Sequence, residues 1–463
     1  MHLVAIGGSD AGISAALRAR ELDPGAEVSV VVADAFPNFS ICGIPYYVSG
    51  EVQDWRSLAH RTRAELEATG MTLLLDTLAT EVDVGGRELL VRSAAGREER
   101  LPFDALVVGT GAVPVRPPIA GLESLGPEDG VHLLHSMGDT FELMRSLAKG
   151  PRRALIVGAG YIGLEMAEGL SARGIEVVQL EQLGEVLPTV DPELGALVHA
   201  ELESHGVTVR CGTTVRAVRR AGTGAPSPLQ VDGECAGEPV SYAADVVLVV
   251  VGARPDSALA AAAGATLGTR GAIAVDRLMR TNLPAVFAAG DCATTYHRLL
   301  GDSYLPLGTT AHKQGRVAAE NALGGTREFA GSLGTQVVKV FDLVAARTGL
   351  RDHEARAAGF EPLTVASEAD DHKAYYPASR KISLRVTGER GSGRLLGLQL
   401  VGHRETAVAK RVDVAAAALF HEMSVEGLSD LDLSYTPPLG SPWDAVQSAT
   451  QAWSRARRAP RQG

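Results

Sequence analysis

Residues 154–163 read ALIVGAGYIG, an apolar strand that runs into three spaced glycines. A helical pattern follows through Leu170, and residues 175–180 read as a second strand that ends at an acid. A full G-x-G-x-x-G between strand and helix, with an acid about twenty residues further on, is the fingerprint of a βαβ unit that binds a nicotinamide dinucleotide. The candidate ligands at this site are Gly158, Gly160, Gly163 and Glu181.

The acid at the end of the second strand favours NADH over NADPH. The carboxylate of Glu181 can accept hydrogen bonds from both ribose hydroxyls and repels a 2′-phosphate. The residues that follow, 182–185, read QLGE and offer no Arg or Lys to hold such a phosphate. We therefore expect NADH as the electron donor, with NADPH as the less favoured alternative.

A second, degenerate copy of the fingerprint opens the chain. Residues 3–12 read LVAIGGSDAG, in which Gly7 permits the tight turn, Gly12 permits close packing of helix on strand, and Ser9 replaces the middle glycine. A helical stretch over 13–21 and a strand over 28–32 complete the unit. Backbone N–H groups at the start of the helix can hold a pyrophosphate. Asp34, just past the second strand, is the candidate ligand for the ribose.

Two later stretches indicate that this first site holds FAD. Residues 107–114, VVGTGAVP, are typical of the strand and turn by which a chain leaves a flavin-binding domain. Residues 281–291, TNLPAVFAAGD, are typical of the segment by which the chain returns to that domain. Asp291 is placed to hydrogen-bond the ribityl chain. The candidate ligands from the segments where the chain leaves and re-enters the flavin-binding domain are Thr110, Gly111, Gly252, Gly290 and Asp291. We therefore expect the flavin-binding domain to be split by the nicotinamide-binding domain.

Length and composition limit the class of protein. The 463 residues exceed what one hydrophobic core usually serves, so two or three domains are expected. The net charge of -11, without a basic stripe, argues against a nucleic-acid partner. Residues 1–6 lack the basic start of a signal peptide, and no apolar run reaches the ~20 residues that a membrane helix needs. Four cysteines at irregular positions suit a reducing cytoplasm and show no zinc spacing, so we expect neither disulfides nor a metal site.

One cysteine stands where redox chemistry is expected. Cys42 lies in NFSICGIPYY, residues 38–47, shortly after the first βαβ unit, so its loop can fold back over a cofactor. No second cysteine follows in the same turn, and the next in the chain is Cys211. A redox-active Cys42 therefore cycles alone, through a mixed disulfide, a persulfide or a sulfenic acid. The alternative is a buried structural thiol.

Five stretches of the chain are similar to one family of flavoenzymes. They are Phe39 with CGIPY at 42–46, the fingerprint at 158–163, residues 281–291, LGTTAHKQGR at 307–316, and YTPP at 435–438. From about Leu3 to Trp443 the chain resembles the FAD-dependent pyridine nucleotide-disulfide oxidoreductases, in particular the single-cysteine branch of coenzyme A-disulfide reductases, NADH oxidases and NADH peroxidases. The resemblance implies a homodimer in which the third domain of one chain lends residues to the active site of the other.

The resemblance also assigns roles to tyrosines. Tyr435, in the YTPP segment, and Tyr375 and Tyr376 upstream are similar to tyrosines of coenzyme A-disulfide reductases whose hydroxyls reach the cysteine sulfur across the dimer. Half-buried packing is the alternative, and it stays open for Tyr375 and Tyr376. Tyr161, inside the second fingerprint, corresponds to a ring that covers the flavin, with core packing as its alternative.

Some residues differ from those that the family carries at the same motif positions, and these differences favour some of the family's activities over others. Asp10 stands where oxidases and peroxidases of the branch carry a His that supports a sulfenic acid. Glu21 and Thr69 occupy two basic positions by which coenzyme A-disulfide reductases hold phosphates, and Ile41 replaces an Asn. We therefore expect an enzyme that passes electrons from NADH through FAD to Cys42 and reduces a small-molecule disulfide or persulfide, with coenzyme A itself not favoured. An NADH oxidase or peroxidase and a ferredoxin-reductase-like electron-transfer flavoprotein are the alternatives.

The expected architecture is an α/β fold with two Rossmann-like domains and a C-terminal α+β dimerisation domain. The predicted bounds are 1–117 and 246–329 for the two parts of the FAD-binding domain, 118–245 for the NAD(P)H-binding domain and 330–463 for the dimerisation domain. A helix start at residues 43–45 and a hydroxyl from Tyr435 of the second chain are expected to lower the pKa of Cys42. His312 is interpreted as a structural histidine, and residues 454–463 as a basic, disordered tail. The other three cysteines, Cys211, Cys235 and Cys292, are expected to be inert.

Overall fold

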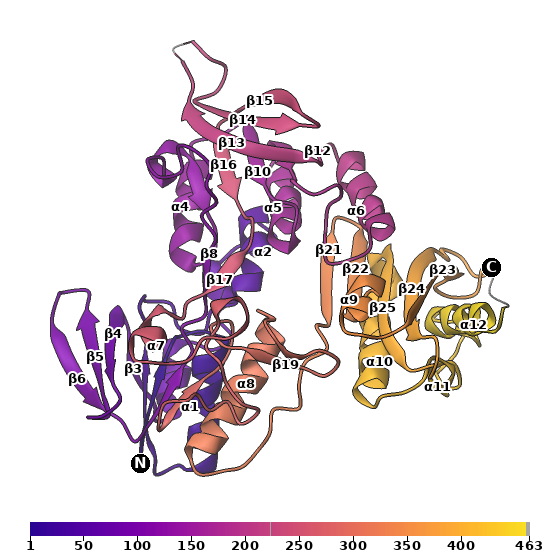
Figure 1. Cartoon of the computed structure of the whole chain (residues 1–463). Coiled ribbons are helices and arrows are strands. Elements are labelled where there is room, and N and C mark those ends of the chain that lie inside the picture. The colour runs from indigo at the N-terminus through magenta and orange to yellow at the C-terminus, as the bar shows by residue number, and fades with distance from the viewer. Residues whose placement is uncertain (223, 460–463) are drawn as a thin grey trace.

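The first parallel sheet draws its strands from two distant parts of the chain. The computed structural model describes residues 1–222 and 224–459 (Figure 1). In this sheet the order is β18-β7-β1-β2-β3 and every pairing is parallel. Its strands are β1 (His2–Ile6), β2 (Glu27–Val31), β3 (Thr72–Leu74), β7 (Ala105–Val108) and β18 (Val286–Ala288). The predicted split of this domain is therefore present.

Two helices cover one face of the first sheet. They are α1 (Asp10–Leu22) and α8 (Gly308–Ala322). They approach closely because a Cβ at Gly315 would meet the carbonyl oxygen of Ala11, so only a glycine fits there. The helix predicted over 13–21 begins three residues earlier than expected. A small antiparallel sheet, β4 (Thr77–Asp83), β5 (Glu88–Ser93) and β6 (Glu98–Pro102), flanks this domain.

A second parallel sheet forms the core of the inserted domain. Its order is β12-β11-β10-β16-β9. The strands are β9 (Val131–Leu133), β10 (Arg153–Val157), β11 (Glu176–Leu180), β12 (Thr208–Arg210) and β16 (Val246–Val249), and the helices are α4 (Met137–Leu147), α5 (Tyr161–Ala172) and α6 (Pro192–Ser204). A three-stranded hairpin sheet, β13 (Thr213–Arg220), β14 (Leu229–Cys235) and β15 (Glu238–Ala244), extends from it.

The predicted boundary between residues 245 and 246 is wrong. β16 pairs with β10 in the inserted domain, with Val246 opposite Ala154, so this domain continues through Val249. All four residues of β16 are buried, as expected of an interior strand of a parallel sheet. The chain then returns along β17 (Ala253–Pro255), which pairs antiparallel with the outgoing β8 (Ala112–Pro114). These two strands connect the two dinucleotide-binding domains (Figure 1).

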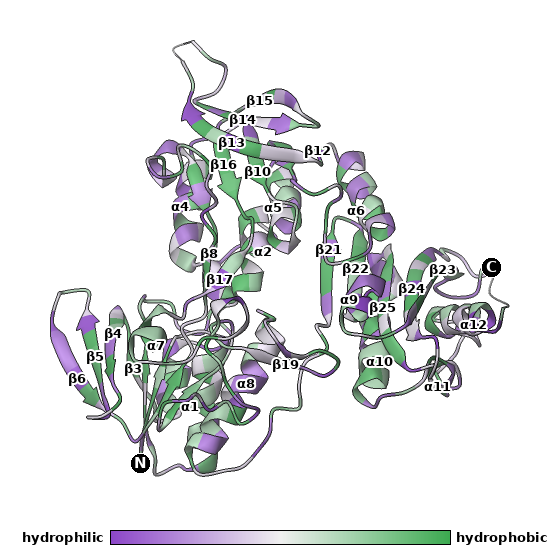
Figure 2. Ribbon diagram, in the orientation of Figure 1, coloured by the Kyte–Doolittle hydropathy of each residue, from purple (hydrophilic) through white to green (hydrophobic). Residues whose placement is uncertain are grey.

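The third domain is an antiparallel sheet of order β21-β22-β25-β24-β23 with helices packed on it. The strands are β21 (Gln336–Val340), β22 (Leu343–Gly349), β23 (Pro362–Asp370), β24 (Lys381–Glu389) and β25 (Leu395–His403), and the helices are α9 (Asp352–Ala357), α10 (Val408–Phe420), α11 (Val425–Ser429) and α12 (Ala445–Arg458). Figure 2 shows that most strands of the two parallel sheets and of the third domain's sheet are apolar, whereas β6 of the small flanking sheet is hydrophilic.

The C-terminal segment is ordered further than the sequence indicates. α12 continues through Arg458, so disorder is a wrong prediction for residues 454–458, and residues 460–463 lie outside the described part of the chain. Trp453 anchors the helix: its side chain is fully buried and its indole N–H donates to the carbonyl of Leu363 at 2.7 Å. Within the described residues, none of the helices combines the length and the apolar character that spanning a membrane requires.

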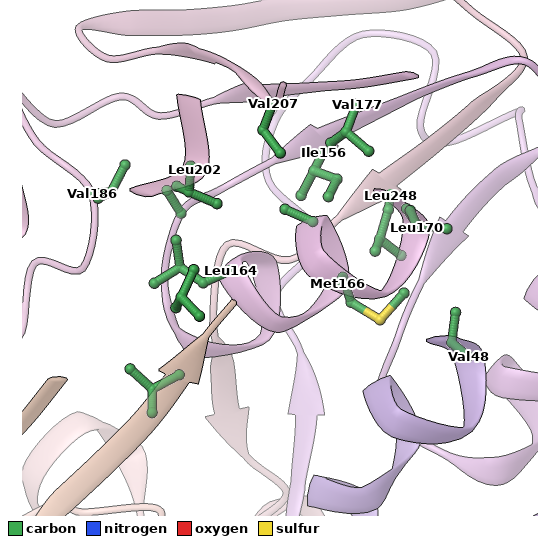
Figure 3. Close-up of a cluster of buried hydrophobic side chains, with 14 of the residues drawn as sticks. Val48, Ile156, Leu164, Met166, Leu170, Val177, Val186, Leu202, Val207 and Leu248 are labelled. Atoms are coloured by element: carbon green, nitrogen blue, oxygen red, sulfur yellow. The ribbon is translucent and has the colours of Figure 1, made fainter. Parts of the chain in front are cut away.

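One hydrophobic core joins the inserted domain to the segment that carries Cys42. Figure 3 shows Val48, from α2 (Ile44–Ser49), beside Met166 and Leu170 of α5, with Ile156 and Leu248 of the second sheet behind them. Gly169 of α5 permits this approach, since a Cβ there would lie 3.2 Å from the carbonyl oxygen of Pro45. The short helix after Cys42 is therefore held against the nicotinamide-binding domain.

Candidate active site

Cys42 lies where the two dinucleotide-binding domains meet. It is a free, exposed cysteine in a 3-10 turn, η1 (Ile41–Gly43), directly before α2. Three carboxyl groups are close enough to act on its thiol: Glu165 from α5, Asp10 from the start of α1, and Asp291 from the turn after β18. The structure thus brings together four side chains from four separate segments of the chain.

The surroundings of Cys42 raise its pKa. Desolvation by the neighbouring protein is the largest cause, followed by the negative charges of Glu165, Asp10 and Asp291. The helix start expected at residues 43–45 is present, with Pro45 in its first turn, but α2 has only six residues. In the single chain, three acids and desolvation therefore outweigh one short helix, and the lowered pKa expected with Tyr435 of a second chain stays a prediction.

A cluster of packed aromatic rings supports the loop that carries Cys42. Phe39 stacks on Trp55 with ring centroids 5.5 Å apart, and Phe36 contacts both rings edge-on. Phe141 of the inserted domain closes the cluster against Trp55 at 5.2 Å. Because these rings come from both domains, they fix the loop relative to α4 of the inserted domain.

The first fingerprint forms a cradle that fits a dinucleotide. A Cβ at Gly7 would meet the carbonyl of Gly109, and one at Gly12 would meet the carbonyl of Gly7. Ser9 caps α1 with its backbone, while its hydroxyl makes no capping bond to the helix. The helix start therefore offers N–H groups to an anionic ligand, as the pyrophosphate of FAD requires.

Asn38 is a residue of this cradle that sequence reasoning left without a role. Its φ is 62°, and its backbone N–H donates to the carbonyl of Gly8 at 2.6 Å. The side chain is buried, and its Nδ2 has no hydrogen-bond partner among the described residues. A buried amide donor without a partner is costly, so its position beside the fingerprint turn fits a bound polar ligand. In the sequence, the only indication of this position is an Asn in a turn directly before the aromatic Phe39.

The other candidate FAD ligands lie around this cradle. Asp34 is exposed, and its carboxylate accepts from the N–H of Phe36 at 2.8 Å. The hydroxyl of Thr110 donates to the carbonyl of Asp256, next to the paired strands β8 and β17. Burial and the charge of Asp10 raise the pKa of Asp291 to about 6. Three candidate glycines have left-handed backbone angles, namely Gly111, Gly252 and Gly290.

Glu181 holds the second fingerprint in place. Its buried carboxylate accepts from the N–H of Ala159 at 2.7 Å with one oxygen and from the N–H of Leu183 at 2.8 Å with the other. A carboxylate oxygen can accept more than one hydrogen bond, so these contacts leave room for ribose hydroxyls. Tyr161, the first residue of α5, accepts a hydrogen bond on its hydroxyl from Thr189 at 3.2 Å.

The three glycines of the second fingerprint differ in what they contact. A Cβ at Gly158 would lie 2.6 Å from the carbonyl of Val250, and one at Gly163 would meet the carbonyl of Gly158. A Cβ at Gly160 would meet nothing within 4 Å. Packing within the protein therefore explains the first and third glycines, and the middle one leaves a surface that a ligand can approach.

The tyrosines lie together on the surface of the third domain. Tyr375, Tyr376 and Tyr435 are 74%, 41% and 44% exposed. Desolvation and the neighbouring Tyr375 raise the pKa of Tyr435, so these two side chains lie close together. The N–H of Lys373 donates to the carbonyl of Pro437, which holds the two tyrosine segments side by side. Leu439 and Trp443, 81% and 56% exposed, continue the same segment. Such exposed rings and apolar side chains are typical of a surface that a partner covers.

Two groups near the site were not predicted. Burial raises the pKa of Glu165 to about 7, with Glu168 adding to the effect. Helical spacing could have found it, because it follows Tyr161 by one turn on α5. His312 was interpreted as structural. Its Nδ1 lies 2.8 Å from the hydroxyl of Ser14 and its Nε2 lies 3.4 Å from Asp10. The rings of His60 and His312 have centroids 6.2 Å apart.

Comparisons with known proteins agree with this arrangement over the whole chain. The family model for the pyridine nucleotide-disulphide oxidoreductases matches residues 1–315, and the model for the dimerisation domain of that family matches residues 335–445. An NADH oxidase of Methanocaldococcus jannaschii is 30% identical over 97% of this chain and 98% of its own. An NAD(P)H coenzyme A polysulfide/persulfide reductase of Pyrococcus horikoshii is 33% identical over 96% of both chains. Among solved structures, an NAD-dependent persulfide reductase from A. fulgidus superposes with a TM-score of 0.91 at 36% identity, covering 99% of this chain and 83% of that one.

Proposed function

The chain belongs to the pyridine nucleotide-disulphide oxidoreductases, and on this basis we propose that it reduces a small-molecule disulfide or persulfide with electrons from NADH, using Cys42 as its only redox-active cysteine. Membership of the family implies FAD and NAD(P)H as cofactors. The observation that carries the proposal is the position of Cys42 at the junction of two dinucleotide cradles. The other three cysteines lie on the hairpin side of the inserted domain or, in Cys292, in a fully buried position.

The chemistry assigned to the chain is thiol–disulfide exchange. The Cys42 thiolate attacks one sulfur of a disulfide, forms a mixed disulfide with it and releases the other half as a thiolate. When bound at the first cradle, FAD would supply the electron pair, taken from NADH as hydride, by which the mixed disulfide is cleaved into the second substrate thiolate and the Cys42 thiolate. Glu165, with a pKa of about 7, can hold a proton beside the sulfur at neutral pH and give it to a departing thiolate.

Two relatives support a sulfur substrate. The names of the proteins from Pyrococcus horikoshii and A. fulgidus both specify persulfide reduction. Glu21 and Thr69, the two positions at which this chain lacks the basic residues of coenzyme A-disulfide reductases, also have arginines beside them. Glu21 pairs with Arg18 at 2.9 Å and with Arg316 at 3.2 Å, and Arg20 donates to the carbonyl of Thr69 at 2.8 Å. Coenzyme A disulfide and persulfide therefore belong in a substrate screen beside uncharged disulfides.

NADH is the proposed donor because of Glu181. Its carboxylate already accepts two backbone N–H groups, so a 2′-phosphate placed there would meet a fixed negative charge. We expect kcat/KM for NADH to exceed that for NADPH by at least about tenfold, or ~1.4 kcal/mol. Steady-state kinetics with both donors measure the ratio, and equal use of the two would remove Glu181 from this role.

Replacement of the redox cysteine separates the two half-reactions. Cys42→Ser should abolish disulfide and persulfide reduction, while NADH still bleaches the flavin absorbance at nearly the normal rate. Anaerobic stopped-flow absorbance follows both halves, and Cys235→Ser is the control because it removes a thiol from outside the site. Full disulfide turnover in Cys42→Ser would contradict the proposal and favour direct electron transfer from the flavin.

An NADH oxidase is the second candidate. The relative from Methanocaldococcus jannaschii bears that name. The imidazoles of His312 and His60 lie beside Asp10, the carboxyl group at the position of the missing family histidine whose charge acts on Cys42. Oxygen consumption with NADH alone, in the absence of a disulfide, tests this function. Turnover with oxygen that equals or exceeds turnover with the best sulfur substrate would make the oxidase the better assignment.

A further inference from the structure

Three side chains with different ligand atoms converge in the nicotinamide-binding domain, away from Cys42. They are Glu185, in the loop after β11, His199 on α6, and Cys211, directly after β12. The Nδ1 of His199 lies 2.9 Å from an oxygen of Glu185. The sulfur of Cys211 lies 3.8 Å from the same oxygen and 3.9 Å from Nδ1. The three atoms therefore form a compact triangle of one oxygen, one nitrogen and one sulfur.

This triangle has the dimensions of a tetrahedral zinc site. Zinc binds thiolate sulfur at about 2.3 Å and imidazole nitrogen or carboxylate oxygen at about 2.0–2.2 Å, so tetrahedral angles place neighbouring ligand atoms roughly 3.3–3.6 Å apart. The three separations between Glu185, His199 and Cys211 lie on both sides of that range. Shifts of a few tenths of an ångström in side chains alone would complete the geometry.

The environment of His199 favours the same interpretation. Its second ring nitrogen, Nε2, lies 3.7 Å from a carboxylate oxygen of Glu203, one helical turn further along α6. Ligating histidines almost always direct their other ring nitrogen to a carboxylate or carbonyl, which fixes the ring and raises its basicity. The oxygen of Glu185 is held in place as well, because it also accepts from the N–H of Val186 at 2.8 Å.

The cluster is partly open to solvent. The side chains of His199 and Glu185 are 25% and 20% exposed, so a cation can enter and a water can take the fourth position. A set of thiolate, imidazole and carboxylate selects zinc over magnesium or calcium, which require oxygen ligands. The sequence does not indicate this cluster, because residues 185, 199 and 211 have no motif spacing and come together only when a loop, a helix and a strand end pack against one another.

We propose that Glu185, His199 and Cys211 bind one Zn²⁺ per chain, with water as the fourth ligand. On binding, the Cys211 S–H bond breaks, its proton goes to solvent, and the sulfur forms a bond to the metal with no change in oxidation state. The site lies beside the strand end that carries Glu181, since the N–H of Thr213 donates to the carbonyl of Glu181 and the N–H of Gly212 to that of Leu183. It is independent of the redox role of Cys42.

Calorimetric titration of the FAD-loaded protein with ZnCl₂ tests the site. Cys42→Ser serves as the parent, so that the exposed redox thiol does not compete for the metal. We expect one zinc per chain in the parent and in the control Cys235→Ser. Cys211→Ser and His199→Gln, each added to the parent, should weaken that binding at least tenfold. Zinc-edge X-ray absorption of the parent should show one sulfur near 2.3 Å.

Two results would overturn the proposal. One is zinc binding to Cys211→Ser or His199→Gln with the stoichiometry and affinity of the parent, which would place the metal at another histidine cluster. The other is an absorption spectrum without a sulfur ligand. Glu185→Gln distinguishes ligand loss from misfolding, because the amide retains the acceptor for the N–H of Val186 and removes the charge that the metal needs. Its melting temperature should match the parent while its zinc affinity falls.

Discussion

The immediate surroundings of Cys42, the proposed nucleophile, oppose the ionisation of its thiol. Desolvation and the charges of Glu165, Asp10 and Asp291 all raise its pKa in the single chain. A thiol-based reductase needs the thiolate, so we propose that compensating groups come from the bound cofactor and from a second subunit. The sequence motif identified Cys42 and its loop. It could not identify its neighbours, because Asp10, Glu165 and Asp291 are brought to the thiol only by the packing of two domains.

Removing the charge of Glu165 should make Cys42 more acidic. The Glu165 carboxylate raises the thiol pKa by repulsion, so neutral Gln at this position should lower it. The change should be visible above pH 7, where Glu165 is ionised, and should vanish at lower pH, where it is protonated. The pH dependence of Cys42 alkylation by iodoacetamide, followed by mass spectrometry of the reduced enzyme, measures the shift.

The control for this variant is Glu176→Gln, which removes an exposed carboxylate paired with Arg153 in the same domain. Its alkylation profile should match that of the unmodified protein. A Glu165→Gln profile displaced to higher pH, or not displaced at all, would show that Glu165 has no charge effect on the sulfur in the assembled enzyme.

The strand–turn–helix units were the most predictable elements, because glycine spacing and apolar periodicity specify them locally. Both βαβ units and the split of the first domain follow the prediction. The start of α1 and the end of the inserted domain do not, since Asp10 extends the helix and Val246–Val249 pairs as an interior strand. The contact of His312 with Ser14 and Asp10 joins residues about 300 apart and leaves no signal in the sequence.

The middle glycine of the second fingerprint should matter for NADH and not for folding. A Cβ at Gly160 meets nothing within 4 Å, so Gly160→Ala should fold and retain FAD normally. It should raise the KM for NADH at least about tenfold, ~1.4 kcal/mol, because the methyl group occupies the approach of the pyrophosphate. Gly163→Ala is the contrasting variant, since its Cβ would meet the carbonyl of Gly158 and should lower the melting temperature. A normal KM in Gly160→Ala would place the dinucleotide elsewhere.

The contact between the inserted and third domains depends on a buried polar group. Asp191, at the start of α6, exchanges hydrogen bonds with Gln399 of β25 at 2.7 and 2.9 Å, and its carboxylate lies 2.6 Å from Nε of Arg385 on β24. Asp191→Ala should destabilise the protein by about 3 kcal/mol, because it leaves the side-chain amide of Gln399 without its acceptor and removes the buried one of the two carboxylates at Arg385. Thermal unfolding followed by circular dichroism should show a melting point several degrees lower.

A nearby acid provides the matched control for this docking contact. Glu193 also pairs with Arg385, at 3.2 Å, but its side chain is 68% exposed. Glu193→Ala should cost no more than about 1 kcal/mol, as exposed pairs do. Equal losses in the two variants would mean that burial does not distinguish the two carboxylates.

We expect the complete molecule to contain a second copy of the chain. Residues 335–445 match the dimerisation domain of the family. We expect the partner to cover a surface of exposed side chains formed by Tyr375, Tyr435, Leu439 and Trp443. Desolvation and the adjacent Tyr375 raise the pKa of Tyr435, which places the two hydroxyls near each other within one chain. The raised pKa of Cys42 in a single chain agrees with a site that is completed across the dimer.

The hydroxyl of Tyr435 should act on Cys42 of the partner. If it donates a hydrogen bond to the thiolate, Tyr435→Phe should slow the disulfide half-reaction by roughly ten- to a hundredfold, since a hydrogen bond to a charged group is worth about 1.5–3 kcal/mol. Flavin reduction by NADH should be unchanged. A heterodimer of one Cys42→Ser chain and one Tyr435→Phe chain should contain one fully competent site, because the intact Cys42 then faces an intact Tyr435. Isolated heterodimers that stay as slow as the Tyr435→Phe homodimer would place the tyrosine in its own chain's packing and remove it from the partner's active site.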